Sequence, residues 1–204
     1  MIKTKLVVAV CFFISSLTVF SQEIQEDVKG KDFIIKDLKS LSFYGGTIFQ
    51  FTTLDNDFSF FVGGKGGVAF NRKVLLGFEG YTLKSSNTSK DNDSKELSFT
   101  YGGVFVGYVF DLGPKVQLVP TVLSAWGRIG EREVEADGDY VFFKVTDDLF
   151  VLQPELELEI NVIKGFKIGL GVNYRLSTGV DSRNYVNDDI SGLGGSIAFK
   201  FGKF

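Results

Sequence analysis

The side chains best suited to chemistry are ionised groups that recur at every second position. Glu155, Glu157 and Glu159 have this spacing, which on a β-strand puts their carboxylates on one face, about 7 Å apart. Paired carboxylates can act as general acid and base in hydrolysis, or can line an ion pathway. The charged candidates are these three residues together with Glu79, Lys65, Arg128, Lys167 and Arg175.

A structural role accounts for this charged set more simply than catalysis does. The set contains both signs of charge, and a buried charge requires a partner of opposite sign. The sequence around the carboxylates does not indicate a substrate cleft. We therefore predict that these residues form a salt-bridge network that fills and stiffens the lumen of a barrel.

Several common kinds of chemistry are missing from the chain. It has no histidine, and its single cysteine, Cys11, lies in an N-terminal apolar run. Ser-His-Asp and Cys-His catalysis of the usual kind are thereby excluded, and a zinc site would lack its preferred ligands. The acidic residues 91–96 lack EF-hand spacing, and the glycines around Lys65 lack Walker spacing. We expect no enzymatic activity, no metal and no cofactor.

The glutamates belong to the clearest structural pattern in the sequence, residues 152–175. Apolar and polar residues alternate from Leu152 to Val162, the pattern breaks at residues 163–165, and it resumes from Phe166. Such alternation on both sides of a tight turn predicts a β-hairpin with one apolar and one charged face. Lys167 and Arg175 then face the glutamates across the hairpin, where opposite charges attract.

The same alternation runs through most of the chain and predicts about eight strands. They are expected at residues 41–52, 58–71, 74–81, 97–110, 116–128, 152–162, 166–176 and 190–204. Residues 55–57, 71–73, 111–115 and 163–165 are expected to be tight turns, while residues 84–96, 130–148 and 177–189 are expected to be long polar loops. Within the second loop, the apolar patch at residues 140–145 could extend the strands. Short turns at one rim and long loops at the other are typical of transmembrane barrels.

The N-terminus has the pattern of an export signal. Lys3 and Lys5 precede an apolar run at residues 6–20, and Ser21 follows it. This predicts a cleaved signal peptide at residues 1–21, with an uncleaved anchor as the alternative. Residues 22–40 are polar and could form either a flexible periplasmic tail or a short helix. Because the net charge is −3 and no basic stripe stands out, we expect no nucleic-acid partner.

With its loop asymmetry, mixed-sign polar faces and aromatic C-terminal strand, the chain resembles the small Gram-negative outer-membrane barrels of the OmpA/OmpX type. The resemblance covers residues 41–204 and implies an all-β, eight-stranded antiparallel up-and-down transmembrane β-barrel. It further implies a monomer in the outer membrane, in contact with lipid and lipopolysaccharide. Its expected role is envelope integrity, or surface binding and adhesion through the long loops.

The resemblance also implies that Phe204 is a signal for the barrel-assembly machinery. Phe204 is out of phase with the alternating Ile197, Phe199 and Phe201, and a terminal bulge would restore the phase.

The main alternative is a secreted soluble barrel of the lipocalin kind. Its Phe-rich faces would turn inward around an apolar ligand, and Glu155, Glu157 and Glu159 would lie in water. Every apolar face would then have to fit inside one small barrel, and so many phenylalanine side chains are too bulky for it, so the membrane interpretation is preferred. The two alternatives differ in which face of each strand points inward.

Overall fold

The structure is a computed structural model that describes residues 40–54, 57–85, 88–89, 92–134, 140–180 and 186–203. The predicted signal peptide, the rest of the polar segment before Ser40, and Phe204 lie outside the described residues, so these predictions remain untested. Within the described part, no helix is long and apolar enough to cross a membrane.

Eight long strands make up the fold. They are β1 (Leu41–Leu54), β2 (Asp57–Phe70), β3 (Val74–Leu83), β5 (Asn92–Tyr108), β7 (Val116–Val134), β8 (Tyr140–Ile163), β9 (Phe166–Thr178) and β10 (Gly192–Gly202). Two short strands, β4 (Thr88–Ser89) and β6 (Phe110–Asp111), and a one-turn helix, α2 (Asn187–Ile190), complete the described elements.

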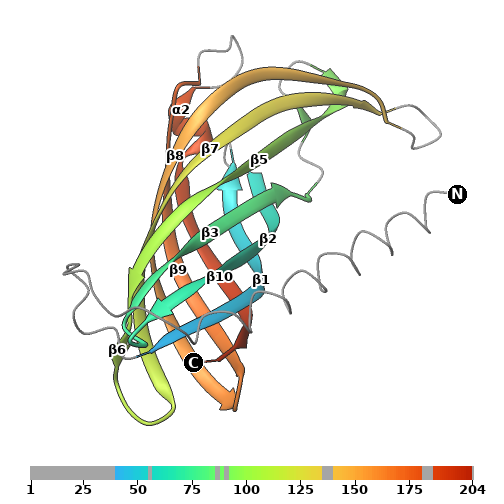
Figure 1. Cartoon of the computed structure of the whole chain (residues 1–204). Helices are drawn as coiled ribbons and strands as arrows, with labels where there is room; N and C mark the ends of the chain where they lie inside the picture. The colour runs from blue at the N-terminus through green and yellow to red at the C-terminus, as the bar shows by residue number, and fades with distance from the viewer. Residues whose placement is uncertain are drawn as a thin grey trace, which may run out of the picture. The chain divides into compact units, whose positions relative to one another are not determined.

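The strands close into a barrel. Each long strand pairs antiparallel with the next one along the chain, and β5 pairs directly with β7. Pairing of β1 with β10, with Thr47 opposite Phe199, closes the ring (Figure 1). Closure leaves the barrel body without the unpaired edges of an open sheet. The prediction of an eight-stranded antiparallel up-and-down barrel is confirmed.

Tight turns join the strands at one rim. Between β2 and β3, Asn71 and Arg72 both adopt positive φ, at 50° and 57°. Two central residues in this region give a turn whose twist matches that of the strands on either side. Gly165, with φ of 84°, provides the positive φ in the turn between β8 and β9. The tight turns predicted at residues 71–73 and 163–165 are therefore confirmed.

At the opposite rim the strands are longer than the sequence pattern indicated. β7 continues to Val134 and β8 begins at Tyr140, so most of the predicted loop at residues 130–148 is strand. The loop prediction was wrong there, although the apolar patch at residues 140–145 does extend β8. Figure 1 shows β7 and β8 projecting beyond the barrel body. A sheet outside the barrel encloses no lumen, so it does not require the apolar alternation by which strands are recognised.

The two other predicted loops also contain regular structure. Residues 84–96 include β4 and the beginning of β5 at Asn92. Residues 177–189 include most of α2, and the last strand begins at Gly192 instead of residue 190. The long-loop rim is therefore more ordered than the polar composition predicted.

The apolar side chains point outward. In β9, residues alternate between buried and exposed, with Leu170, Val172 and Leu176 on the exposed side. Phe78 is 72% exposed on β3, and Trp126 is 68% exposed on β7. Only some large aromatic rings face the lumen; Phe61, Phe99 and Phe105 are buried there. This orientation contradicts the lipocalin-like alternative, which required the Phe-rich faces to enclose a ligand.

Candidate functional site

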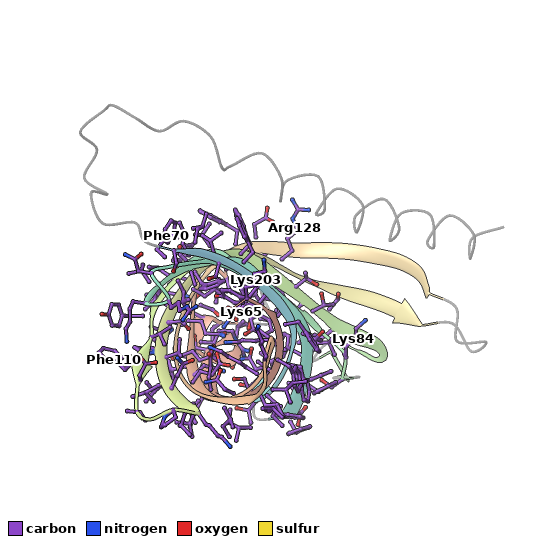
Figure 2. The ribbon with its side chains drawn as sticks, turned by 60° about the horizontal axis from the view of Figure 1, so that its bottom comes forward. Lys65, Phe70, Lys84, Phe110, Arg128 and Lys203 are labelled. Atoms are coloured by element: carbon purple, nitrogen blue, oxygen red, sulfur yellow. The ribbon has the colours of Figure 1, made fainter. Side chains whose placement is uncertain are left out.

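A continuous network of ion pairs crosses the lumen. Lys65 Nζ lies 3.0 Å from Glu79, 3.4 Å from Glu155 and 3.7 Å from Glu157. Lys200 Nζ lies 2.6 Å from both Glu157 and Glu159. Lys167 Nζ extends the network with a contact of 2.9 Å to Glu159. Figure 2 shows Lys65 inside the ring of strands.

Strand register brings these side chains together. Lys65 on β2 and Glu79 on β3 are direct cross-strand partners. Glu157 on β8 lies opposite Gly171 on β9, and Glu159 lies opposite Gly169. A Cβ at Gly169 would overlap the Glu157 carboxylate, and one at Gly171 would come within 2.6 Å of Glu155 Oε1. The inward glycines of β9 thus provide the space that the glutamate side chains occupy.

Neutral groups complete the hydrogen bonding of the network. The hydroxyl of Tyr81 donates to Glu79, and that of Ser196 donates to Glu155. The Lys167 ammonium donates to the side-chain oxygen of Gln117 as well as to Glu159. Glu157 Oε1, in contrast, is buried and has no hydrogen-bond partner among the described residues.

The network itself carries four carboxylates and three ammonium groups, a formal charge of −1. Arg175 is a fourth buried cation, so the buried charges of the described residues sum to zero. Such neutrality limits the electrostatic cost of burying eight ionised groups.

Arg175 faces the lumen but contacts no glutamate in the described structure. Its Nε donates to the carbonyl oxygen of Ile190 at 2.7 Å, and its NH2 group donates to that of Thr53 at 3.3 Å. The guanidinium carbon lies 5.2 Å and 5.6 Å from the ring centres of Phe61 and Phe99. Arg175 therefore links α2 and the end of β1 to β9 at the long-loop rim.

A neutral polar layer occupies the lumen beside these charges. The Tyr101 hydroxyl donates to Gln153 Oε1 at 2.9 Å and lies 3.1 Å from Gln50 Oε1. Gln50 Nε2 donates to Asn173 Oδ1 at 3.1 Å. Tyr101 also stacks on Tyr81 with a centroid distance of 5.0 Å. Side chains from five strands thus meet across the lumen at this layer.

The structure places Arg128 outside the predicted network. Its Nε lies 3.0 Å from Asp148 Oδ1, and the two side chains are 71% and 77% exposed. Figure 2 shows Arg128 outside the ring of strands. It shares the outer face of β7 with the exposed Trp126, while the buried Ala125 and Ile129 face inward. The prediction that Arg128 belongs to the lumenal network was wrong. Arg128 is one residue out of phase with the inward-facing residues of β7, so its side chain points outward.

Lys200 was missing from the predicted network although it is central to it. It lies between Phe199 and Phe201 on β10, and period-two alternation puts it on the face opposite those two rings. Parity within the last strand would have identified Lys200 as lumenal. Its partners, Glu157 and Glu159, could not be identified before strand register was known.

At the short-turn rim, an exposed ion pair joins two neighbouring turns. Lys73 Nζ lies 2.6 Å from Asp111 Oδ2, and Gln117 Nε2 donates to Asp111 Oδ1 at 2.6 Å. These hydrogen bonds hold the pKa of Asp111 below its ordinary value; the bond from Lys73 has the larger effect and the bond from Gln117 the next largest. The pair is solvent-exposed, so its contribution to stability is small.

The described residues contain no group of three or more His, Cys, Asp or Glu side chains placed to hold a metal ion. Each network carboxylate is instead within ion-pair distance of a lysine. The network therefore neutralises the carboxylates with ammonium groups inside the barrel.

No protein-family model and no curated protein sequence matches the chain. Among solved structures, Neisserial surface protein A (NspA) matches with a TM-score of 0.55 and 11% identity, over 80% of this chain and 97% of that one. The chain has the fold of the small outer-membrane β-barrels. Two structures of Ail, the attachment invasion locus protein of Yersinia pestis, also match over 80% of this chain and 97% of theirs. Their identities are 15% and 14% and their TM-scores 0.46 and 0.45; in the second, Ail is in complex with the heparin analogue sucrose octasulfate.

Proposed function

We propose that the chain is a non-enzymatic barrel of the outer membrane, exported through a cleaved signal peptide, that presents its long-loop rim for surface binding. The observation that carries this proposal is the inside-out distribution of side chains, with apolar groups outward and ionised groups in the lumen. Soluble monomers rarely expose large continuous apolar surfaces, whereas lipid chains solvate such a wall.

The height of the apolar wall supports a membrane location. On β9 the outward apolar series runs from Phe166 to Leu176, ten residues farther along the strand. At about 3.3 Å per residue and a tilt of roughly 40°, this series spans about 25 Å, the height of the apolar band of such barrels. The charged pair Lys73–Asp111 lies at one rim. The pair Arg128–Asp148 lies toward the other, where the apolar wall ends.

Heat-modifiable gel migration tests this proposal. Detergent-extracted or refolded protein should run at different positions before and after boiling, because a closed barrel resists detergent unfolding until it is heated. The protein should also fractionate with the outer membrane. Recovery in the soluble periplasmic fraction, together with no migration shift, would contradict the proposal.

Surface binding is supported by an open sheet edge beyond the barrel. Residues 140–149 of β8 pair with β7 on one side, and the β8–β9 ladder begins only at Phe150, opposite Thr178. The second side of residues 140–146 has no strand partner in the described structure. Such an edge offers backbone donors and acceptors to an extended segment of another protein. We therefore propose that strand addition at this edge is the mode of binding.

Selected peptide ligands can test strand addition. Peptides chosen for binding to the refolded protein should slow the hydrogen exchange of amides within residues 140–146. Backbone N-methylation of the same peptides should abolish binding, since it removes the ladder hydrogen bonds. Protection restricted to other parts of the long-loop rim would contradict strand addition while leaving the membrane location intact.

A further inference from the structure

The short-turn rim of the barrel is strongly basic. Its turns and the end of β10 carry four exposed cations and one half-buried cation: Arg72, Lys115, Lys164, Lys203 and Lys73. Asp111 is the only acidic residue among the described residues of these turns. Five cations against one carboxylate give the rim a formal charge of +4, in a chain whose net charge is −3. We call these five cationic residues the basic collar.

The cations of the collar come from places far apart in the sequence. Arg72 and Lys73 lie between β2 and β3, Lys115 lies between β6 and β7, Lys164 lies between β8 and β9, and Lys203 follows β10. Figure 1 shows the turn after β6 and the C-terminal end of β10 at the same end of the barrel. The collar does not form a basic stretch of sequence, because each turn contributes only one or two cations. Up-and-down closure brings them together on one rim.

The opposite rim does not have this excess of positive charge. Its described exposed charges include Lys84 and Arg128 but also Asp57, Asp148 and Asp188. Arg128 forms an ion pair with Asp148 there. The two rims therefore differ in charge, and the field of the collar attracts anions to the short-turn side.

The collar lies directly beyond the end of the apolar wall. Lys164 follows Ile163, which is 68% exposed, and Lys203 lies two residues beyond Phe201, which is 59% exposed. At a rise of about 3.3 Å and a tilt of roughly 40°, two residues correspond to about 5 Å of height. Phe166 and Phe201 stack at this level with a centroid distance of 4.8 Å, and such aromatic rings flank the apolar band of membrane barrels. The cations are thus within reach of lipid headgroups if the barrel spans the membrane as proposed.

A hollow of about 420 Å³ lies at the same rim but is a poorer site for an anion. Lys73 and Asp111 line it and lie 2.6 Å apart. Lys167 and Glu159 also line it and lie 2.9 Å apart. The charges of the hollow therefore cancel in pairs, apart from that of Arg72. The exposed cations around the mouth of the lumen, and not the mouth itself, hold the excess of positive charge.

We infer that the basic collar binds the phosphate groups of anionic glycerophospholipids in the inner leaflet of the outer membrane. That leaflet faces the periplasm, the side on which barrels of this kind have their short turns. Each lysine ammonium binds a phosphate as a point charge, and the guanidinium of Arg72 can bind one bidentately. This inference rests on the proposed membrane location and adds a preference for one class of lipid to it.

Tryptophan fluorescence can report on the lipid at one part of the collar. Trp126→Phe removes the only tryptophan of the chain, and Phe110→Trp adds one at the short-turn rim as a first probe. Position 110 is exposed and precedes the turn that contains Lys115. Val109 N donates to the carbonyl oxygen of Lys73 at 2.7 Å, which brings this probe next to the β2–β3 turn as well.

A second probe reports on the rest of the collar. In the same background, Phe201→Trp places a tryptophan at an exposed position two residues before Lys203. Gly202 N donates to the carbonyl oxygen of Gly165 at 3.0 Å, which brings this probe next to the β8–β9 turn and Lys164.

Quenching by brominated lipid measures the preference. The full chain is refolded into phosphatidylcholine vesicles that contain a graded fraction of lipid brominated in the acyl chain. The brominated lipid is phosphatidylglycerol, which is anionic, or phosphatidylcholine, which is zwitterionic. At low salt, half-maximal quenching of either probe should need about fivefold less brominated phosphatidylglycerol, the ratio expected for roughly one cation acting on each lipid. At 1 M salt, where the Debye length is about 3 Å, the two lipids should quench alike.

Variants assign the preference to particular cations. Arg72→Asn combined with Lys115→Gln should remove it at the first probe and leave it at the second. Asparagine is chosen because it tolerates the positive φ of position 72. Lys164→Gln combined with Lys203→Gln should have the reverse effect. Heat-modifiable migration identifies the variants that fold.

Lys84→Gln combined with Arg128→Gln is the matched control, since it removes two cations from the opposite rim and should leave both preferences unchanged. Equal quenching by the two lipids at low salt, or a preference that only the control changes, would overturn the inference. Loss of the preference when inorganic phosphate or a polyglutamate peptide is added at constant ionic strength would assign the collar to a soluble anion or an acidic protein instead. Failure of the chain to insert into any vesicle, with no heat-modifiable migration, would contradict the proposed membrane location itself.

Discussion

Individual lumenal residues are matched by size as well as by charge. Gly169 and Gly171 lie on β9 beside the long side chains of Glu157 and Glu155. Because the interior of an eight-stranded barrel is only wide enough for side chains to fill, a large residue on one strand requires a small one on its neighbour. Charge pairing alone would not build the network, since the carboxylates also need this space to reach their lysines.

Lys200→Met tests the energetic role of the network. It removes the ammonium that Glu157 and Glu159 share, and leaves buried carboxylate charge without that partner. We expect the free energy of unfolding to fall by about 3 to 5 kcal/mol, measured by urea titration of the refolded protein in lipid vesicles. The matched control is Lys73→Met in the exposed Lys73–Asp111 pair, which should cost less than about 1 kcal/mol. Equal losses for the two variants would show that burial of the network does not matter.

Gly169→Ala tests the packing argument without changing any charge. The added methyl group would overlap the Glu157 carboxylate and displace it from Lys200. We expect a loss of about 1 to 3 kcal/mol in unfolding free energy. Gly195→Ala, whose methyl group meets its nearest neighbour at 3.8 Å, should change stability little. If Gly169→Ala leaves the unfolding free energy unchanged, the lumen has space for the added methyl group, which would contradict the packing argument.

Among the secondary-structure elements, α2 depends on one side chain from the barrel wall. The helix has four residues, too few to be stable in isolation. Ile190 is fully buried, and its carbonyl oxygen accepts from Arg175 Nε. Ser177 N also donates to the hydroxyl of Ser191, directly after the helix. Contacts with β9 thus hold α2 at the long-loop rim.

Arg175→Met should release α2 while the barrel stays closed. The variant loses the hydrogen bonds to Ile190 and Thr53, each made by a charged donor. Such bonds contribute roughly 1.5 to 3 kcal/mol, so amides of residues 187–191 should exchange about ten- to a hundredfold faster. Hydrogen exchange followed by mass spectrometry measures this change, with Arg128→Met on the outer face as the control. If the amide exchange rates of residues 187–191 do not change, apolar packing of Ile190, and not Arg175, holds α2 in place.

At the scale of the whole fold, the described strands form a closed barrel with a packed interior. The ion-pair network, the Tyr101 layer and Arg175 with its two aromatic neighbours are separate groups of side chains within the lumen. The cross-strand contacts that these groups make leave little room for bulk water. This packing argues against an open diffusion pore and agrees with the proposed function, in which the barrel carries the projecting sheet.

Planar-bilayer recording tests whether the lumen conducts. The refolded wild-type protein should insert without discrete current steps, because several layers of side chains obstruct the path. Tyr101→Ala combined with Gln153→Ala opens the neutral layer but leaves the ion-pair network in place, so it should also remain silent. Reproducible current steps from the wild-type protein would contradict a filled lumen.

Much of this architecture follows from alternation in single strands. The hairpin of β8 and β9, with glutamates on one face and leucines on the other, was predicted within a few residues of its observed bounds. The projecting part of β7 and β8 was not, because residues outside the barrel follow no inside–outside pattern. Arg128 was misplaced and Lys200 was omitted for another reason: parity was not applied to them. Arg128 is in phase with the outward Trp126, and Lys200 is out of phase with Phe199 and Phe201.

The sequence by itself determined the strand count, the hairpin order and the division of each strand into an apolar and a polar face, because all of these depend on near neighbours along the chain. The tertiary structure decided which face lies inside, which lysine meets which glutamate, and which rim gathers the exposed cations. These features depend on register and closure, which bring β2, β8 and β10 together across the lumen from positions far apart in the chain.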